Sequence, residues 1–222
     1  MPVEIDIARR LATIADATLE IVATEGIDGV TIRAVARRVG GSTTLVTNYL
    51  PTREALLRNA VEHAIASWGE EIGQVVEGAA ERERLSAVAR WACSTQGNDQ
   101  VLRRLFMEIL GRGGPESEAL RVLREDARQS RDLLAEAARG ARAADAEFAA
   151  DVLHLVLRGF YLSSLEDPER WSGERMSPLI ERLVPLLAAA PPASAPPGPS
   201  CPPGATAETA AAPGSSGRRP GR

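Results

Sequence analysis

The chain has 222 residues, of which 44% are hydrophobic and 25% charged, with a formal net charge of −4 at pH 7. These values are typical of a soluble globular protein with one or two domains, and the whole-chain charge does not indicate a nucleic-acid partner. All 26 basic residues are arginine, which excludes chemistry that requires lysine, such as a Schiff base or a phosphate-loop lysine.

Side chains that bind metals or act as nucleophiles are sparse. The two cysteines, Cys93 and Cys201, form no CxxC pair, and the two histidines, His63 and His154, have no metal-ligand spacing. We therefore expect no disulfide framework, metal, cofactor or catalytic site. The chain has no apolar signal segment and no run of about 18 apolar residues, so we expect a cytoplasmic protein without membrane contact.

The N-terminal part is predicted to form three helices. Apolar residues recur every three or four positions over residues 7–21, and Gly26 is placed to end that helix. Thr31 is a preferred N-cap residue for a short second helix, which the Gly40-Gly41 pair ends. A third short helix is predicted over residues 42–49.

Helical periodicity continues to residue 190. Pro51 interrupts the chain, and Thr52 is a preferred N-cap for a fourth helix that reaches about residue 76. Five more helices are predicted over about 81–96, 99–111, 115–140, 143–166 and 177–189. Expected boundary residues are Asn98 as an N-cap, Pro115 as a helix start, the Ser177-Pro178 cap, and Pro185, which should kink or shorten the last helix. With no strand-period segment, the predicted fold class is all-α with nine helices.

Residues 191–222 have a different composition. Of these 32 residues, nine are proline, five glycine and seven alanine, and none is valine, isoleucine, leucine or aromatic. Such a segment cannot bury enough apolar surface to offset its chain entropy. We expect it to be a disordered tail.

One stretch, VGGSTTLVTNYL at residues 39–50, combines a glycine turn with an unusual density of hydroxyl groups. Two short helices joined by such a turn are typical of a helix-turn-helix, here over about residues 31–50. The second helix of that motif enters the major groove, where short hydrogen-bonding side chains can approach base edges. Residues 30–58 also contain five arginines and one acid, a local charge of +4. This local charge favours contact with phosphates.

Residues from about 7 to 65 resemble the N-terminal domain of the TetR family of transcriptional regulators. The resemblance rests on ATEGIDGVTIRAVARRVG, GGSTTLVTNYL and PTREALL, with turn, helix and proline breaks at the spacing of the family. It implies a DNA-binding domain over residues 5–52, a helical effector-binding and dimerisation domain over 53–190, and then the tail. By resemblance, the DNA-contacting residues are Thr31, Arg33, Ser42, Thr43, Thr44, Thr47, Asn48, Tyr49 and Arg53.

The C-terminal half resembles the family more weakly, through LVLRGFYLSSLEDPERW. The resemblance implies a homodimer formed by the helices predicted over about 143–166 and 177–189, and an effector cavity for an unknown small molecule. Effector pockets are mostly apolar with a few polar groups. The candidate lining residues are Trp91, Phe106, Met107, His154, Phe160 and Tyr161.

The expected function is therefore that of a ligand-responsive repressor that binds a near-palindromic double-stranded DNA operator as a dimer. Two alternatives remain open at this point: an α-helical small-molecule-binding protein, or an enzyme, that does not act through DNA.

Overall fold

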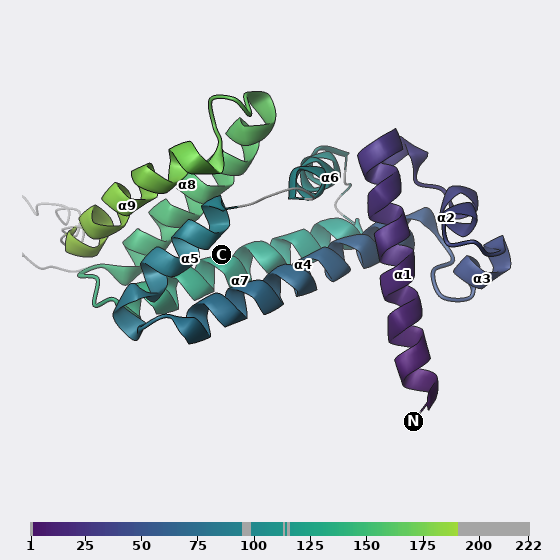
Figure 1. The fold of residues 1–222 in the computed structure, drawn as a ribbon, viewed down its shortest axis with the longest axis horizontal. Coiled ribbons are helices and arrows are strands. Elements are labelled where there is room, and N and C mark those ends of the chain that lie inside the picture. The colour runs from purple at the N-terminus through teal and green to yellow at the C-terminus, as the bar shows by residue number, and fades with distance from the viewer. Residues whose placement is uncertain (1, 95–98, 113, 115, 191–222) are drawn as a thin grey trace, which may run out of the picture. The chain divides into compact units, whose positions relative to one another are not determined.

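The computed structural model describes residues 2–94, 99–112, 114 and 116–190 (Figure 1). These residues form nine α-helices, two short 3₁₀ helices and no strand, which confirms the predicted all-α class. The α-helices are α1 (Pro2–Glu25), α2 (Ile32–Arg38), α3 (Thr43–Thr47), α4 (Arg53–Gly78), α5 (Arg84–Cys93), α6 (Asp99–Arg112), α7 (Glu118–Gly140), α8 (Ala146–Glu166) and α9 (Gly173–Ala189). The 3₁₀ helices, which the sequence did not predict, are η1 (Ile27–Gly29) and η2 (Glu81–Glu83).

Hydroxyl side chains begin the three helices α2, α3 and α4. Thr31 Oγ1 accepts a hydrogen bond from the Ala34 amide at 3.1 Å, and Ser42 and Thr52 cap α3 and α4 in the same way. Each cap satisfies an amide that a helix N-terminus leaves without an intrahelical partner. The helix starts predicted from the Thr31 and Thr52 caps, and the start predicted near residue 42, are confirmed.

A glycine pair turns the chain between α2 and α3. Gly40 has φ 69°, in the left-handed region that residues with a Cβ avoid. Its amide donates to the Arg37 carbonyl, and the Gly41 amide donates to the Ala36 carbonyl at 2.9 Å. This pair of bonds is a Schellman motif, which satisfies the last carbonyls of α2 and sets the direction in which the chain continues to α3.

Several helix starts predicted in the C-terminal half are wrong by a few residues. Helices α7 and α8 begin at residues 118 and 146 rather than at 115 and 143. In each case the nearest capping side chain decides the start, because Ser117 accepts from the Leu120 amide and Asp145 from the Phe148 amide. Helix α5 likewise begins only at residue 84, after η2, and ends at residue 93. The predicted boundary residues Asn98 and Pro115 lie outside the described part of the chain.

The last helix begins earlier than predicted. Ser172 caps α9, and the helix runs through both Pro178 and Pro185 to residue 189, so Ser177-Pro178 does not start the helix and Pro185 does not shorten it. A proline inside a helix removes one backbone hydrogen bond and costs about 3 kcal/mol. Burial of an apolar face against α5 and α8 offsets this cost; its buried residues are Met176, Ile180, Val184 and Leu187.

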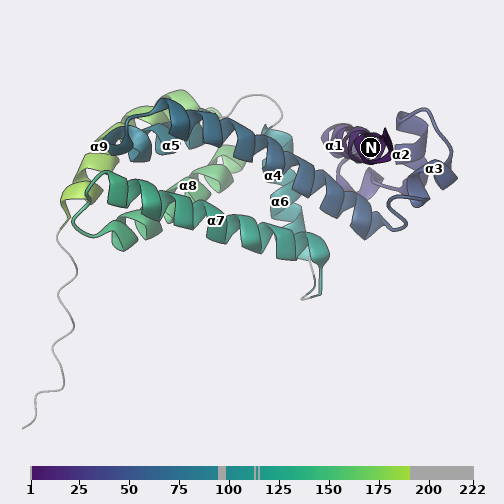
Figure 2. The ribbon, with the colours of Figure 1, turned by 90° about the horizontal axis from the view of Figure 1, so that it is seen from below.

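Two hydrophobic clusters form the interior. The first is built from α1, α2, α3, the first half of α4, α6 and the start of α7, and the second from α5, the rest of α7, α8 and α9. Helices α4 and α7 lie side by side and take part in both clusters (Figure 2). The predicted domain boundary at residue 52 therefore falls inside the first cluster, which continues through Leu56, Leu57 and Val61 of α4.

Helix α8 is long and apolar enough, by length and composition alone, to cross a membrane, contrary to our expectation that no segment would be. Two of its charged side chains pair with α7. Arg158 donates to Asp126 of α7 at 3.1 Å, and Asp151 accepts from Arg131 of α7 at 2.8 Å. These bonds and its buried residues are typical of a helix that packs against α7 inside a helical bundle.

Candidate nucleic-acid interface and ligand cavities

Helices α2 and α3 pack against each other as a helix-turn-helix and separate their apolar and polar residues. Val35, Val46 and Leu50 are buried in the first hydrophobic cluster. On α3, by contrast, Ser42, Thr43 and Thr44 are exposed. The apolar residues thus hold the α3 N-terminus in place while its hydroxyl groups face solvent.

The hydroxyl groups of this region do not all have the same freedom. Ser42 and Thr31 are occupied as N-caps, and half-buried Thr47 donates to the Thr44 carbonyl at 3.3 Å. Thr43 and Thr44 make no side-chain hydrogen bond within the described residues. They are therefore the hydroxyls most available to an external partner.

The remaining two predicted contacts on this segment lie at the end of α3. Asn48 is the C-cap residue of α3 and is exposed. Tyr49 is half-buried and its ring packs against the first hydrophobic cluster. The structure thus places Asn48 toward solvent and uses much of the Tyr49 side chain for packing.

The local excess of arginine is largely engaged within the protein. Arg38 donates to Glu20 of α1 at 2.8 Å, and Arg58 donates to Glu118 of α7 at 2.7 Å. Arg33 and Arg37 on α2 are exposed and make no ion pair with any described residue. Arg37 was not among the predicted DNA contacts. Its position in the arginine cluster, at the polar end of α2, could have indicated such a contact.

Arg53 lies in a different environment from the one expected of a phosphate contact. Its Nε donates to the Val30 carbonyl at 3.0 Å and its Nη2 donates to the Ile27 carbonyl at 2.7 Å. Nη2 is also 3.9 Å from a carboxylate oxygen of Asp28. The guanidinium therefore fixes η1 to the start of α4.

The six predicted pocket residues do not share one cavity. Trp91, His154 and Tyr161 line a cavity of about 30 Å³ between α4, α5, α7 and α8. Phe160 lines a separate hollow of about 310 Å³ between α8 and α9. Two residues lie elsewhere: Phe106 packs edge-on against Trp68 in the first hydrophobic cluster, and half-buried Met107 lines neither of these cavities.

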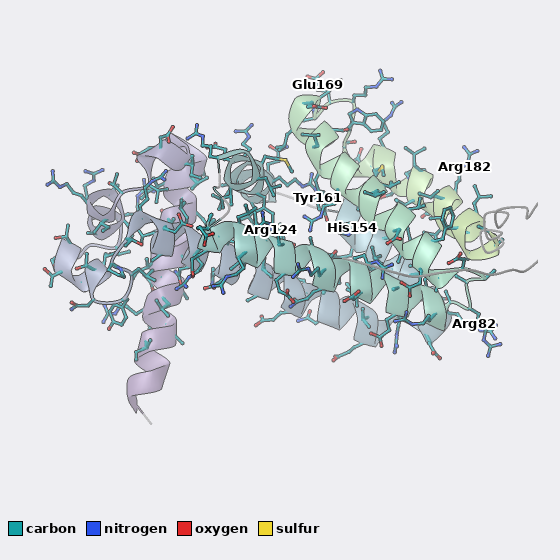
Figure 3. The ribbon with its side chains drawn as sticks, turned by 180° about the vertical axis from the view of Figure 1, so that it is seen from behind. Arg82, Arg124, His154, Tyr161, Glu169 and Arg182 are labelled. Carbon is teal, nitrogen blue, oxygen red and sulfur yellow. The ribbon has the colours of Figure 1, made fainter. Side chains whose placement is uncertain are left out.

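At the small cavity, the surroundings favour the neutral forms of His154 and Tyr161. Burial and nearby Arg158 lower the pKa of His154, while burial raises the pKa of Tyr161 to about 12. The buried guanidinium of Arg103, from α6, lies over the rings of Phe160 and Tyr161, with its carbon 4.5 Å from the Tyr161 ring centre. Figure 3 shows His154 and Tyr161 on α8. Arg103 is thus the charged group that α6 contributes to this region.

Cys93, at the end of α5, lies in an environment that disfavours its thiolate form. It is fully buried, and this burial raises its pKa to about 11. Because the thiolate is the nucleophilic form, almost none of it is present at neutral pH. Among the described residues there is also no group of three His, Cys, Asp or Glu side chains that would hold a metal ion.

A larger cavity lies between α1, α4, α5 and α6, and of the six predicted pocket residues only Trp91 lines it. It is a cleft of about 750 Å³, within the range of small-molecule sites. We call it the acidic cleft, because three carboxylates and no arginine line it. Its principal lining residues are Asp16, Glu20, His63, Trp68, Glu71 and Trp91.

Comparisons with known proteins give one family and a shared fold. A family model for the C-terminal domain of BetI-type transcriptional repressors matches residues 81–189. No curated protein matches the chain. A structure described as a transcriptional regulator from Pseudomonas aeruginosa PAO1 is 24% identical with a TM-score of 0.69, over 82% of this chain and 91% of that chain.

Two further solved structures have the same architecture. A protein from Rhodococcus sp. described as a TetR-family transcriptional regulator is 18% identical with a TM-score of 0.66, over 82% of this chain and all 100% of that chain. A transcriptional regulator from Saccharomonospora viridis in complex with choline is 16% identical with a TM-score of 0.70, over 80% of this chain and 96% of that chain. At such identities the likeness shows the fold.

Proposed function

The chain belongs to the TetR family of transcriptional regulators, and we propose that it is a cytoplasmic repressor that binds a near-palindromic operator as a homodimer and releases it on binding a small molecule. The observation that carries this proposal is the exposed row of hydroxyl groups at the start of α3, on a helix-turn-helix held by a Schellman turn. Such a helix start presents short hydrogen-bonding side chains and amides to base edges and phosphates.

The proposed DNA surface centres on four side chains. Thr43 and Thr44 would read bases, because they are exposed and uncommitted within the described structure. Arg33 and Arg37 would neutralise phosphates from α2, since neither is held by a described carboxylate. Ser42 and Thr31 contribute mainly by capping the starts of α3 and α2.

An unpartnered apolar stripe supports the homodimer. The large apolar side chains exposed on α8 are seven residues apart: Phe148, Leu155 and Leu162. Those exposed on α9, Leu179 and Leu186, have the same spacing. Leu155 and Leu186 are each 69% exposed. Exposed apolar side chains that repeat along a helix in this way are typical of a protein interface, and two copies of the pair α8–α9 would form a four-helix contact.

Contacts between α6 and the DNA-binding helices offer a route for effector control. The N-terminal turn of α6 lines the acidic cleft through Val101 and Leu102. Its C-terminal end reaches η1, where Arg112 donates to Asp28 at 2.7 Å. A ligand that displaces α6 would therefore shift η1, the segment to which Arg53 is bound, and change the populations of conformations that fit the operator.

The proposed function is tested by a mobility-shift assay with DNA flanking the coding region and with a selected random pool. We expect a sequence-preferring complex whose affinity falls as salt rises. Thr44→Ala is expected to alter base preference at one or two operator positions, at a cost of about 1–3 kcal/mol each. Thr13→Ala, on an exposed site of α1, serves as the matched control and should leave the preference unchanged. No sequence-preferring complex with either DNA would overturn the proposal.

The two basic positions Arg37 and Arg53 should behave differently. Arg37→Ala is expected to weaken binding to all sequences alike and to lower the salt slope by about 1, with an unchanged melting temperature. Arg53→Ala should lower the melting temperature, because it removes two charge-assisted bonds to carbonyls, on the order of 1 kcal/mol for a partly exposed group. Thermal melts and salt titrations separate the two. An Arg53→Ala protein with wild-type stability and a reduced salt slope would instead identify Arg53 as a phosphate contact.

The enzyme alternative has less support than the regulator. The thiol of Cys93, a possible nucleophile, is buried and its pKa is raised. The family match is to repressors rather than to enzymes. We therefore propose that the chain is not an enzyme, and turnover of a bound effector by the purified protein would contradict this.

A further inference from the structure

We propose that the helix-turn-helix selects operator half-sites with A·T pairs opposite α3, and that the γ-methyl groups of Thr43 and Thr44 make this selection by contact with thymine methyl groups. The inference rests on the proposed regulatory function and adds the class of base that is recognised. It starts from the exposed side chains of residues 42–49, none of which carries a charge; they are Ser42, Thr43, Thr44 and Asn48.

The recognition segment lacks the side chains that select G·C pairs. Arginine or lysine reads guanine through two hydrogen bonds to O6 and N7, and a carboxylate accepts from cytosine N4. Residues 42–49 contain no arginine, lysine, aspartate or glutamate. The exposed arginines without a described ion pair, Arg33 and Arg37, lie on α2, and the first helix of a helix-turn-helix crosses the DNA backbone. They are therefore placed for phosphates rather than for the bases opposite α3.

The threonine methyl group is the part of these side chains that distinguishes one base from another. A hydroxyl both donates and accepts, so it discriminates poorly between base edges. Thymine alone presents a methyl group in the major groove, and a threonine methyl placed against it makes an apolar contact that no other base offers. Asn48 is the exposed amide of the segment, and an asparagine amide pairs best with adenine. The exposed groups of α3 that discriminate between bases thus favour A·T pairs.

The position of Thr43 and Thr44 in the first turn of α3 leaves their side chains uncommitted. Threonines deeper in a helix bond backwards. Three on α1 each donate to the carbonyl four residues earlier, at 2.7–2.9 Å; they are Thr13, Thr18 and Thr24. For Thr43 and Thr44 the corresponding carbonyls belong to the end of α2 and the glycine turn, and neither side chain makes a hydrogen bond within the described residues. Both methyl groups are therefore available to a base.

The test uses the operator selected from the random pool, with single thymines replaced by deoxyuridine, which removes the C5 methyl group and keeps the base-pairing groups. Affinity is measured by mobility shift at one salt concentration for the wild type, Thr43→Ser and Thr44→Ser, which lose the γ-methyl group and keep the hydroxyl. Burial of one methyl group corresponds to about a fourfold change in affinity. We expect deoxyuridine at one or two positions of a half-site to weaken wild-type binding about fourfold each, and to have no further effect on the matching serine variant.

Two controls isolate the methyl contact. Thr13→Ser, at an exposed site of α1, should respond to deoxyuridine as the wild type does. At a sensitive position, a 5-methylcytosine·guanine pair should bind the wild type about fourfold more tightly than a cytosine·guanine pair, because it returns a methyl group to the same place in the groove. The matching serine variant should not distinguish these two pairs.

Three results would each overturn the inference and leave the regulatory function intact. They are G·C pairs at the operator positions whose preference Thr44→Ala alters, no thymine whose replacement weakens wild-type binding, and equal deoxyuridine responses of the wild type and both serine variants. The absence of any sequence-preferring complex would instead overturn the regulatory function itself, so the two failures are distinguishable.

Discussion

Replacing Leu155 with arginine is expected to convert the proposed dimer into a monomer and to reduce operator affinity by about a hundredfold or more. Leu155 lies in the middle of the apolar stripe of α8 and is 69% exposed in the single chain. In the proposed dimer its side chain is buried, which stabilises association by about 1.5–3 kcal/mol per subunit, whereas a buried unpaired arginine opposes it. Loss of the dimer removes simultaneous contact with two half-sites, and affinity falls with it.

Leu110→Arg is the matched control for this prediction. Leu110 is 50% exposed on α6, outside the stripe, so its replacement should leave the oligomeric state unchanged. Sedimentation velocity and mobility-shift assays measure both properties, and circular dichroism checks that each variant is helical. A folded Leu155→Arg protein that remains dimeric would show that the subunits associate through another surface.

The second large effect is expected from Gly173→Ala at the start of α9. A Cβ at this position would press against the backbone carbonyl oxygen of Cys93, at the end of α5, and backbone cannot move as a flexible side chain would. Overpacking of this kind costs about 1–3 kcal/mol, occasionally more. The melting temperature should therefore fall by about 2–12 °C, because each kcal/mol corresponds to about 2–4 °C in a chain of this size.

For Gly73→Ala on α4 we expect no loss of stability, in contrast to Gly173→Ala. No atom lies within 4 Å of the position that its Cβ would take. Alanine is the better helix former by about 0.5–1 kcal/mol, so this variant should be as stable as the wild type or more stable. Thermal melts of both variants measure the contrast. Equal melting temperatures for the two would mean that the α5–α9 contact relaxes without cost.

Much of the fold was predictable because its signals are local. Thr31, Ser42 and Thr52 each cap the helix that follows, and the Gly40-Gly41 pair forms the expected turn. The last helix was predicted less well. Its two prolines indicated a late start and an early end, but burial of residues such as Ile180 and Val184 keeps the helix continuous. The prediction from the prolines was wrong because tertiary packing outweighed the lost backbone hydrogen bonds.

The candidate sites were predicted only in part, because the roles of long side chains depend on non-local partners. The sequence places Arg37, Arg38 and Arg53 in one basic cluster. The structure binds Arg38 to Glu20 and Arg53 to two carbonyls, and leaves Arg37 uncommitted among the described residues. The predicted pocket residues were likewise distributed over separate regions, since aromatic character does not indicate which helices enclose a cavity.

The sequence by itself determined the helical class and the helix-turn-helix, because capping residues, glycine turns and apolar spacing act over a few neighbouring positions. Only the tertiary structure decided which charges remain free and where a cavity opens. Asp16, Glu71 and Trp91 belong to three helices and are separated by up to 75 positions in the chain, yet they line one cleft. Their proximity comes from the packing of α1, α4 and α5, and no local pattern encodes it.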